Sequence, residues 1–205
     1  MTKMTKNIDN LLSPRSGYRI NIIGDYKCGK TTIFKNGDGM ELNHSPSVSP
    51  TVDCRNYNNK DASFFFIITD TPGHSSFDNM NEFFYVNYDG LMIVVDLSNE
   101  KHFLRLPLLI DKIKDVNSDY NSPDKTIIIV GNDRGRQVVS DEQIENFAKQ
   151  HAFFYFKFNI SETCFLNKIY ELIIENKKNG KPKFRPPCFY KMINCFQNNK
   201  PKLFE

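Results

Sequence analysis

A glycine-rich loop that ends in a lysine and a threonine carries the residues best suited to chemistry in this chain. Residues 24–31 read GDYKCGKT, which fits the phosphate-binding pattern G-x-x-x-x-G-K-[ST]. Glycines let the backbone curl so that its N–H groups point at phosphate oxygens, and a helix that begins behind them adds partial positive charge. In such a loop Lys30 would reach the β- and γ-phosphates, and the Thr31 hydroxyl would bind Mg²⁺. The pattern therefore predicts that this loop binds phosphate groups.

Another chemical motif, DTPGH at residues 70–74, follows the apolar run FFFII at residues 64–68. The length of the run predicts a strand that is buried on both faces. An aspartate at the carboxyl end of a strand beside a phosphate-binding loop is well placed to hold Mg²⁺, so we assign this role to Asp70. Because Gly73 has no side chain, its N–H could approach the γ-phosphate closely.

The rest of the chain alternates between strand and helix patterns with short connections. Strands are expected at residues 18–24, 51–57, 63–69, 91–96, 126–130 and 153–158. Helices are expected in a short stretch after residue 31 and at residues 79–88, 103–116, 140–150 and 163–176. Ser140 and Gln143 have the spacing of a capping box, and residues 58–61 are typical of a hairpin turn.

This alternation predicts an α/β fold with a mostly parallel sheet of six strands and helices on both of its faces. In such sheets a nucleotide binds at the carboxyl ends of the strands. The chemical motifs fall at these ends, at residues 24–31, 70–74, 131–133 and 159–161. The sheet would therefore bring motifs that are distant in the sequence to one edge.

The composition is that of a single domain, because 205 residues with 40% hydrophobic and 25% charged content suffice for one full core. The sequence contains no secretion signal and no apolar run long enough to span a membrane, and its five cysteines lack zinc-site spacing. We expect a cytoplasmic protein with reduced thiols. The chain divides into a loose leader (1–16), the main domain (17–176) and a tail (177–205) with eight Lys or Arg residues against one Glu.

The order of these motifs resembles that of the small GTPases of the Ras superfamily, and most closely that of the Rab branch. The resemblance covers about residues 17–176 and implies the small-GTPase version of the P-loop NTPase fold. It rests on residues 24–31, on PTVD at 50–53, on DTPGHSSF at 70–77, on DG at 89–90 with VVD at 94–96, on VGN at 130–132 and on RQVVS at 136–140.

The resemblance implies a GTP-binding molecular switch in vesicle trafficking or signalling, which hydrolyses GTP to GDP and uses Mg²⁺. Thr51 would be the threonine that binds Mg²⁺ and senses the γ-phosphate, with Ser47 and Ser49 as alternatives. Effector and regulator proteins would bind residues 40–57 and 70–88.

The site residues that the resemblance implies form three overlapping groups. Mg²⁺ would be bound by Thr31, Thr51 and Asp70. Catalysis would depend on His74, Gly73 and Lys30. The nucleotide would contact Asp25, Tyr26, Lys27, Cys28, Gly29, Lys30, Thr31, Thr32, Thr51, Asp70, Gly73, Asn132, Asp133, Asn159 and Ile160.

The sequence departs from the family where hydrolysis would take place. Tyr26 and Lys27 stand where the family usually has small residues, and Tyr26 would crowd the space above the γ-phosphate. His74 takes the place of the glutamine that orients the attacking water, and its donor and acceptor have a different geometry. We therefore expect slow GTP hydrolysis that a partner protein assists.

The motifs that read the base are also altered. The family uses N-K-x-D for guanine, whereas here Asn132 is followed by Asp133, Arg134 and Gly135. Asp133 would substitute for the missing aspartate if the loop is shortened by two residues. The segment NIS at residues 159–161 replaces the family's S-A-K, so guanine preference rests mainly on the resemblance.

The tail lacks the terminal cysteines that carry prenyl groups in Rab proteins. Its basic and aromatic residues would instead bind an anionic membrane surface from the cytosolic side, with Cys188 and Cys195 as candidates for palmitoylation. The alternative is a disordered tail, or one docked on its own domain. No RNA-binding motif accompanies the basic residues, so we expect no nucleic-acid partner.

An alternative function is that of a pseudo-GTPase scaffold, which binds partners with its nucleotide locked or absent. The altered base motifs and Tyr26 favour it, whereas the intact Lys30, Thr31, Asp70 and Gly73 oppose it. A P-loop ATPase or kinase is a weaker third reading, because the sequence shows no lid region or acceptor site.

Overall fold

The computed structural model describes residues 17–35, 48–59, 62–120, 122–162 and 164–179. The predictions for the leader, for Ser47 and for most of the tail lie outside these residues. Within the described residues, no helix is long and apolar enough to cross a bilayer.

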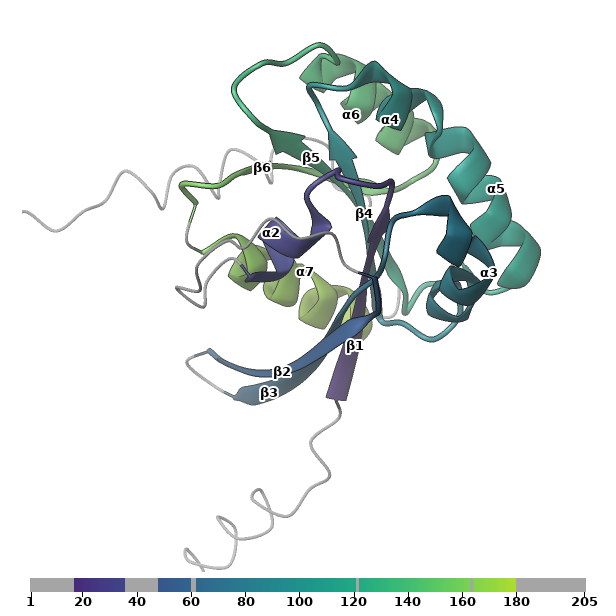
Figure 1. Cartoon of the computed structure of the whole chain (residues 1–205). Helices are drawn as coiled ribbons and strands as arrows, with labels where there is room; N and C mark the ends of the chain where they lie inside the picture. Colours follow the sequence, from purple (N-terminus) through teal and green to yellow (C-terminus); the bar gives the residue numbers. More distant parts are fainter. Residues whose placement is uncertain (1–16, 36–47, 60–61, 121, 163, 180–205) are drawn as a thin grey trace, which may run out of the picture.

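One sheet of six strands forms the centre of the molecule (Figure 1). Its strands lie in the order β2-β3-β1-β4-β5-β6, with β2 antiparallel to β3 and the other neighbours parallel. The strands are β1 (Gly17–Gly24), β2 (Thr51–Asn58), β3 (Ser63–Asp70), β4 (Gly90–Asp96), β5 (Thr126–Asp133) and β6 (Phe154–Asn159). The predicted α/β fold with a mostly parallel six-stranded sheet is confirmed.

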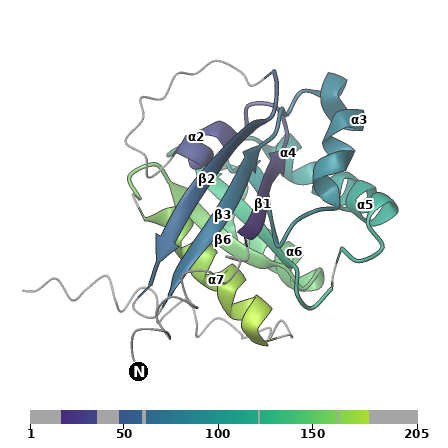
Figure 2. The same cartoon turned by 90° about the horizontal axis from the view of Figure 1, so that it is seen from below.

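Helices cover both faces of this sheet (Figure 2). Helices α2 (Lys30–Lys35) and α7 (Phe165–Asn179) lie on one face. The other face carries α3 (Asp78–Asn81), α4 (Glu100–Leu104), α5 (Leu106–Val116) and α6 (Asp141–Gln150), with the short 3₁₀ turns η1 (Ser75–Phe77) and η2 (Glu82–Tyr85) beside α3.

Apolar side chains fill both layers between sheet and helices. On β4, for example, Met92 and Val94 pack toward α7, whereas Leu91, Ile93 and Val95 pack toward α5 and α6. All five are fully buried, which explains why the strand is a continuous apolar run rather than an alternating one.

The prediction that β3 is buried on both faces is wrong in part. Phe66 and Ile68 are fully buried against α7, but Phe65 and Ile67 on the opposite side are only half-buried. The reason is the position of β3 beside the edge strand, since the buried apolar cluster of that face contains no β3 side chain among the described residues.

Two predicted helices are interrupted. The expected helix 79–88 is α3 followed by the 3₁₀ turn η2, and it ends at Tyr85. The expected helix 103–116 is divided at Arg105 into α4 and α5, with Pro107 in the first turn of α5, where its missing N–H costs no hydrogen bond. Periodicity alone did not locate either break.

The capping box at the start of α6 is confirmed. The Ser140 hydroxyl accepts from the Gln143 N–H at 3.2 Å, and the Gln143 side chain accepts from the Ser140 N–H at 2.8 Å. Helix α7 begins at Phe165 and continues to Asn179, three residues beyond the predicted end.

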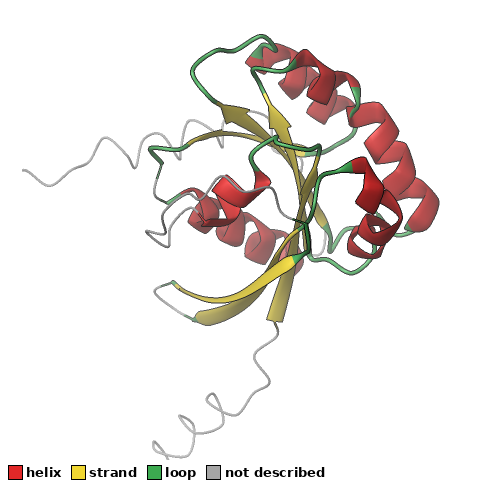
Figure 3. Ribbon diagram, viewed as in Figure 1, coloured by secondary structure: helices red, strands yellow, loops and turns green. Residues whose placement is uncertain are grey.

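The parallel strands end together, so the loops that follow β1, β3, β4 and β5 gather at one edge of the sheet (Figure 3). The register pairs Asp70 with Ile22, Gly24 with Val94, and Asp96 with Asn132. This edge is where the chemical motifs were expected.

Candidate functional site

The loop between β1 and α2 makes a tight curl that requires glycine at two positions. Gly24 has φ +143° and Gly29 has φ +105°, both outside the range that most residues adopt. A Cβ atom at Gly24 would lie 2.5 Å from the Val94 carbonyl oxygen, and one at Gly29 would lie 2.1 Å from the Asn132 side-chain nitrogen. The glycines of the predicted phosphate loop are thus required both by conformation and by space.

The ammonium group of Lys30 lies inside this curl. Its Nζ donates to the carbonyl oxygens of Gly24 at 3.0 Å and Asp25 at 2.8 Å, and the residue is only 6% exposed. The site that a Cβ at Gly73 would occupy is 2.3 Å from this Nζ, so the DTPGH segment passes directly over the ammonium. Lys30 and Gly73 are therefore brought together as predicted from two distant motifs.

The residues expected to bind Mg²⁺ also meet. The Thr31 hydroxyl donates to the Asp70 carboxylate at 2.7 Å, and Thr51 is the antiparallel register partner of Asp70 on β2. Hydroxyl and carboxylate oxygens are the ligands that Mg²⁺ takes from proteins when phosphates supply the rest, so these residues fit the ion. The described part of the chain has no group of three or more His, Cys, Asp or Glu side chains that could hold a metal ion by themselves, and Mg²⁺ bound together with phosphates does not need one.

Tyr26 in the phosphate loop and His74, which follows Gly73, are in ring contact. Their rings meet edge to face with centroids 5.6 Å apart, and the Lys27 ammonium lies 5.2 Å from the Tyr26 ring centre. The His74 Nδ1 accepts from the Ser76 backbone N–H at 3.2 Å. In this arrangement Nδ1 of His74 is the acceptor, and Nε2 is the donor of the neutral ring.

On the far side of the loop, Asn132 lies at the end of β5 and is 4% exposed. Its side chain donates to the Cys28 carbonyl at 2.9 Å and so ties β5 to the phosphate loop. Thr32 lies in the first turn of α2 behind the loop. The Asp25 carboxylate pairs with Arg105 at 3.2 Å, an interaction that the sequence did not predict.

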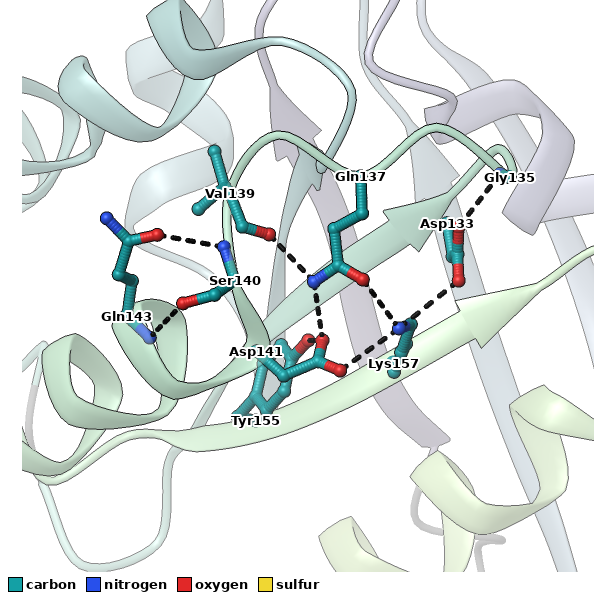
Figure 4. Close-up of polar contacts among 9 residues, drawn as sticks. All are labelled: Asp133, Gly135, Gln137, Val139, Ser140, Asp141, Gln143, Tyr155 and Lys157. Atoms are coloured by element: carbon teal, nitrogen blue, oxygen red, sulfur yellow. Dashed lines mark hydrogen bonds and ion pairs between the residues drawn. The ribbon is translucent and has the colours of Figure 1, made fainter.

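Asp133, the expected base-reading residue, takes part in a polar cluster (Figure 4). One carboxylate oxygen accepts from the Gly135 N–H at 2.8 Å, and the other lies 3.2 Å from the Lys157 ammonium. Lys157 also binds Asp141 and Gln137, each at 3.0 Å. The hydrogen bond from Gly135, more than the nearby Lys157, keeps the pKa of Asp133 below its usual value, so this carboxylate is ionised and held.

The predicted segment at the end of β6 forms a turn. The Asn159 side chain accepts from the Ser161 N–H at 3.0 Å and from its hydroxyl at 2.8 Å, and Ile160 is exposed between them. Asn159, at which this turn begins, is paired with Asp133 across the sheet. Both residues thus lie at the same edge as the phosphate loop, as predicted, although the contacts of Asn159 are with its own turn and those of Asp133 are with Gly135 and Lys157.

Comparisons with known proteins agree with this arrangement. A model described as the Ras family matches residues 19–179. Ras-related protein RabN1 of Dictyostelium discoideum is 28% identical over 178 residues, which cover 81% of this chain and 78% of that protein. Ras-related protein RabC of the same organism is 23% identical over 175 residues, with 80% and 87% covered, and Ras-related protein RabT2 is 28% identical over 117 residues, with 56% and 52% covered.

Proposed function

This chain belongs to the Ras family, and on that premise we propose that it is a Rab-like switch that binds GTP or GDP with Mg²⁺ and hydrolyses GTP slowly. Family membership supports the GTP-binding switch role. The observation that carries the proposal is the meeting of Lys30, Gly73 and the Thr31–Asp70 pair at one edge of the sheet.

Each of these groups has a role in binding. The backbone N–H groups of the curl would hold phosphate oxygens, and Lys30 would exchange its two carbonyl contacts for contacts with the β- and γ-phosphates. Thr31, Asp70 and Thr51 would hold Mg²⁺. When bound, the ion would neutralise charge on the phosphates.

The contact between Tyr26 and His74 supports slow hydrolysis. A water that attacks the γ-phosphate must be oriented and must lose a proton. In the arrangement described, Nε2 of His74 would donate to the water or to a phosphate oxygen, which is a different geometry from that of the family's glutamine. The Tyr26 ring is in edge-to-face contact with the His74 ring and would restrict the space for the water. A partner protein that moves the Tyr26 ring and supplies an acceptor would speed the reaction.

The proposed base and partners are those typical of the family. Guanine would be held by Asn132, Asp133, Asn159 and Ile160, with Asp133 turned from Lys157 toward the base. Effectors and regulators would bind residues 40–57 and 70–88, whose conformation would depend on the presence of the γ-phosphate. The process served would be vesicle trafficking or signalling. The basic tail would bring the protein to the cytosolic face of an anionic membrane, and no nucleic-acid partner is proposed.

A pseudo-GTPase scaffold is the other candidate. Two observations favour it: the Tyr26 ring contacts His74, and both oxygens of the Asp133 carboxylate have partners within the protein. In this case partners would bind the same surfaces, with the nucleotide locked or absent.

Thermal unfolding with added nucleotide separates the two functions. For protein first stripped of bound nucleotide, GTP and GDP with Mg²⁺ should each raise the melting temperature, by the equivalent of about 4 kcal/mol at 1,000 times the dissociation constant, and ATP should do so less. Single-turnover phosphate release from GTP-loaded protein then measures hydrolysis. If neither GTP nor GDP shifts the melting temperature of the stripped protein, the scaffold without nucleotide is the correct function, and if GTP binds but no phosphate is released, the scaffold with locked nucleotide is correct.

A further inference from the structure

One peptide of the phosphate loop is held in an unfavourable conformation. Lys27 has φ +60°, in the left-handed region that residues other than glycine, asparagine and aspartate rarely adopt. The next residue, Cys28, is fully buried, so the chain must turn sharply inward at this point. Such a conformation persists only where the surrounding structure holds it.

Two side chains from the carboxyl end of β5 hold the two carbonyl groups at this turn. The Asn132 side chain donates to the Cys28 carbonyl at 2.9 Å, and the Arg134 guanidinium donates to the Lys27 carbonyl at 2.8 Å. The C=O and N–H groups of a trans peptide point in opposite directions. Fixing these two carbonyl groups therefore also fixes the directions of the Cys28 and Gly29 N–H groups.

Arg134 is itself anchored in the sheet. Its other terminal nitrogen pairs at 3.4 Å with Asp96, which is 5% exposed at the end of β4. The second oxygen of Asp96 accepts from the Ser98 N–H at 2.9 Å and from its hydroxyl at 2.6 Å, so the carboxylate cannot turn away. The planar guanidinium thus binds both the Asp96 carboxylate and the Lys27 carbonyl. Arginine suits this bridging role better than lysine, because its donors are spread over a rigid planar group.

We propose that Arg134 is a positioning residue for the nucleotide. By binding the Lys27 carbonyl, it keeps the backbone of the phosphate loop in the conformation that binds the phosphates, and so slows nucleotide release. This inference rests on the proposed function. Arg134 touches the loop rather than the ligand, so its loss should act on the nucleotide through the Lys27 peptide. It should raise the dissociation rate constant more than it lowers the stability of the nucleotide-free fold.

The test is the release of a fluorescent GDP analogue from the full chain with Mg²⁺ present. Arg134→Ala should raise the dissociation rate constant about tenfold or more, because a charge-assisted hydrogen bond is lost, and Arg134→Lys should lie between it and the unaltered protein. Arg136→Ala, which removes an exposed arginine from the same loop, is the matched control and should change the rate little.

A rescue variant tests whether Arg134 acts on nucleotide release through the backbone conformation of Lys27. Glycine adopts positive φ without strain, so Lys27→Gly added to Arg134→Ala should bring the rate back toward the original value. Lys27→Ala, which removes the same side chain but keeps the strain, should not.

Three results would overturn the inference. One is release from Arg134→Ala at the unaltered rate, another is equal rescue by Lys27→Gly and Lys27→Ala, and the third is loss of melting temperature in nucleotide-free Arg134→Ala large enough to explain the faster release. If the unaltered protein binds no GDP analogue at all, the proposed function fails first and the role of Arg134 fails with it. Normal binding together with an inert Arg134 would overturn this inference alone.

Discussion

At the residue scale, the phosphate loop depends on one buried ammonium group. Lys30 contacts two backbone carbonyl oxygens of its own loop and lies under Gly73, so it links the two motifs that would sense the γ-phosphate. Phosphate oxygens are charged acceptors and carbonyl oxygens are not, so a bound nucleotide would attract this ammonium more strongly than the loop does.

Replacing Lys30 tests this role. Lys30→Ala should weaken the binding of GTP and GDP by about ten- to a hundredfold, since hydrogen bonds to charged groups contribute about 1.5–3 kcal/mol. The measurement is the dissociation constant from nucleotide titration. The matched control is Lys35→Ala in the last turn of the same helix, which should leave affinity nearly unchanged. Equal affinity in Lys30→Ala and in the unaltered protein would rule out the phosphate-loop assignment.

The aromatic pair Tyr26 and His74 yields a prediction about rate. The double variant Tyr26→Gly, His74→Gln should hydrolyse GTP about tenfold faster or more in single-turnover phosphate release, because it opens the space for the water and adds a carbonyl acceptor. Tyr26→Phe, which keeps the ring, should stay slow. A double variant as slow as the starting protein would place the block elsewhere.

The residues of the phosphate loop were predictable, whereas the residues that support it were not. Gly24, Gly29 and Lys30 act through local backbone geometry, and such geometry leaves a fixed spacing in the sequence. Arg134 reaches the Lys27 carbonyl from 107 residues away, and the Lys157–Asp133 pair joins two strands. These contacts depend on which loops the sheet brings together, so no local pattern indicates them.

At the scale of elements, the order of the strands determines which loops lie together at the site. Placing β1 between β3 and β4 brings the phosphate loop between the DTPGH segment and the ends of β4 and β5. The α4–α5 break places His102 and Arg105 beside a cavity of about 120 Å³, which Asp25 and Gly73 also line. His102 in α4 and Arg105 at the break between α4 and α5 therefore lie beside the phosphate loop.

Burial of histidine in these elements predicts a pH dependence of stability. Desolvation lowers the pKa of His102 in α4, and likewise that of His151 after α6, below the value of about 6.5 expected in the unfolded chain. The unfolded state therefore binds protons first as the pH falls below 6.5, so the free energy of unfolding decreases until the pH passes the folded pKa values.

Urea unfolding at pH 7.5 and 5.5 checks this dependence. His102→Gln and His151→Gln should each remove part of the stability difference between the two pH values, and the double variant should remove most of it. An undiminished difference in the double variant would contradict the assignment.

The elements themselves were largely predictable, because β1 and β4 contain marked apolar runs and α6 begins with a capping pattern. The break between α4 and α5 was not predicted. Pro107 is compatible both with a helix start and with a kink, and the choice depends on how the two segments pack against the sheet. The half-burial of β3 likewise depends on where the helices lie, which an apolar run does not encode.

At the scale of the whole molecule, the tail is the part proposed to meet a membrane. Residues 180–205 contain six Lys or Arg residues and one Glu, and each basic residue near an anionic surface contributes about 1 kcal/mol. Because α7 continues to Asn179, a chain cut after this residue keeps the described domain whole.

Sedimentation with lipid vesicles tests this proposal. The full chain should sediment with phosphatidylserine-containing vesicles at low salt and be released as the salt concentration rises, whereas the chain ending at Asn179 should stay in the supernatant. Vesicles of neutral lipid are the control. A full chain that never binds the anionic vesicles would exclude the membrane role of the tail.

The measurement that tests the central claim most directly is the identity of the nucleotide that the protein carries. Full-length protein is purified with Mg²⁺ and denatured, and the released small molecules are separated by chromatography. The proposed switch predicts about one equivalent of guanine nucleotide per chain, with a substantial share of GTP because hydrolysis is slow. A protein that carries no nucleotide and takes up none when GTP and Mg²⁺ are added would contradict the claim.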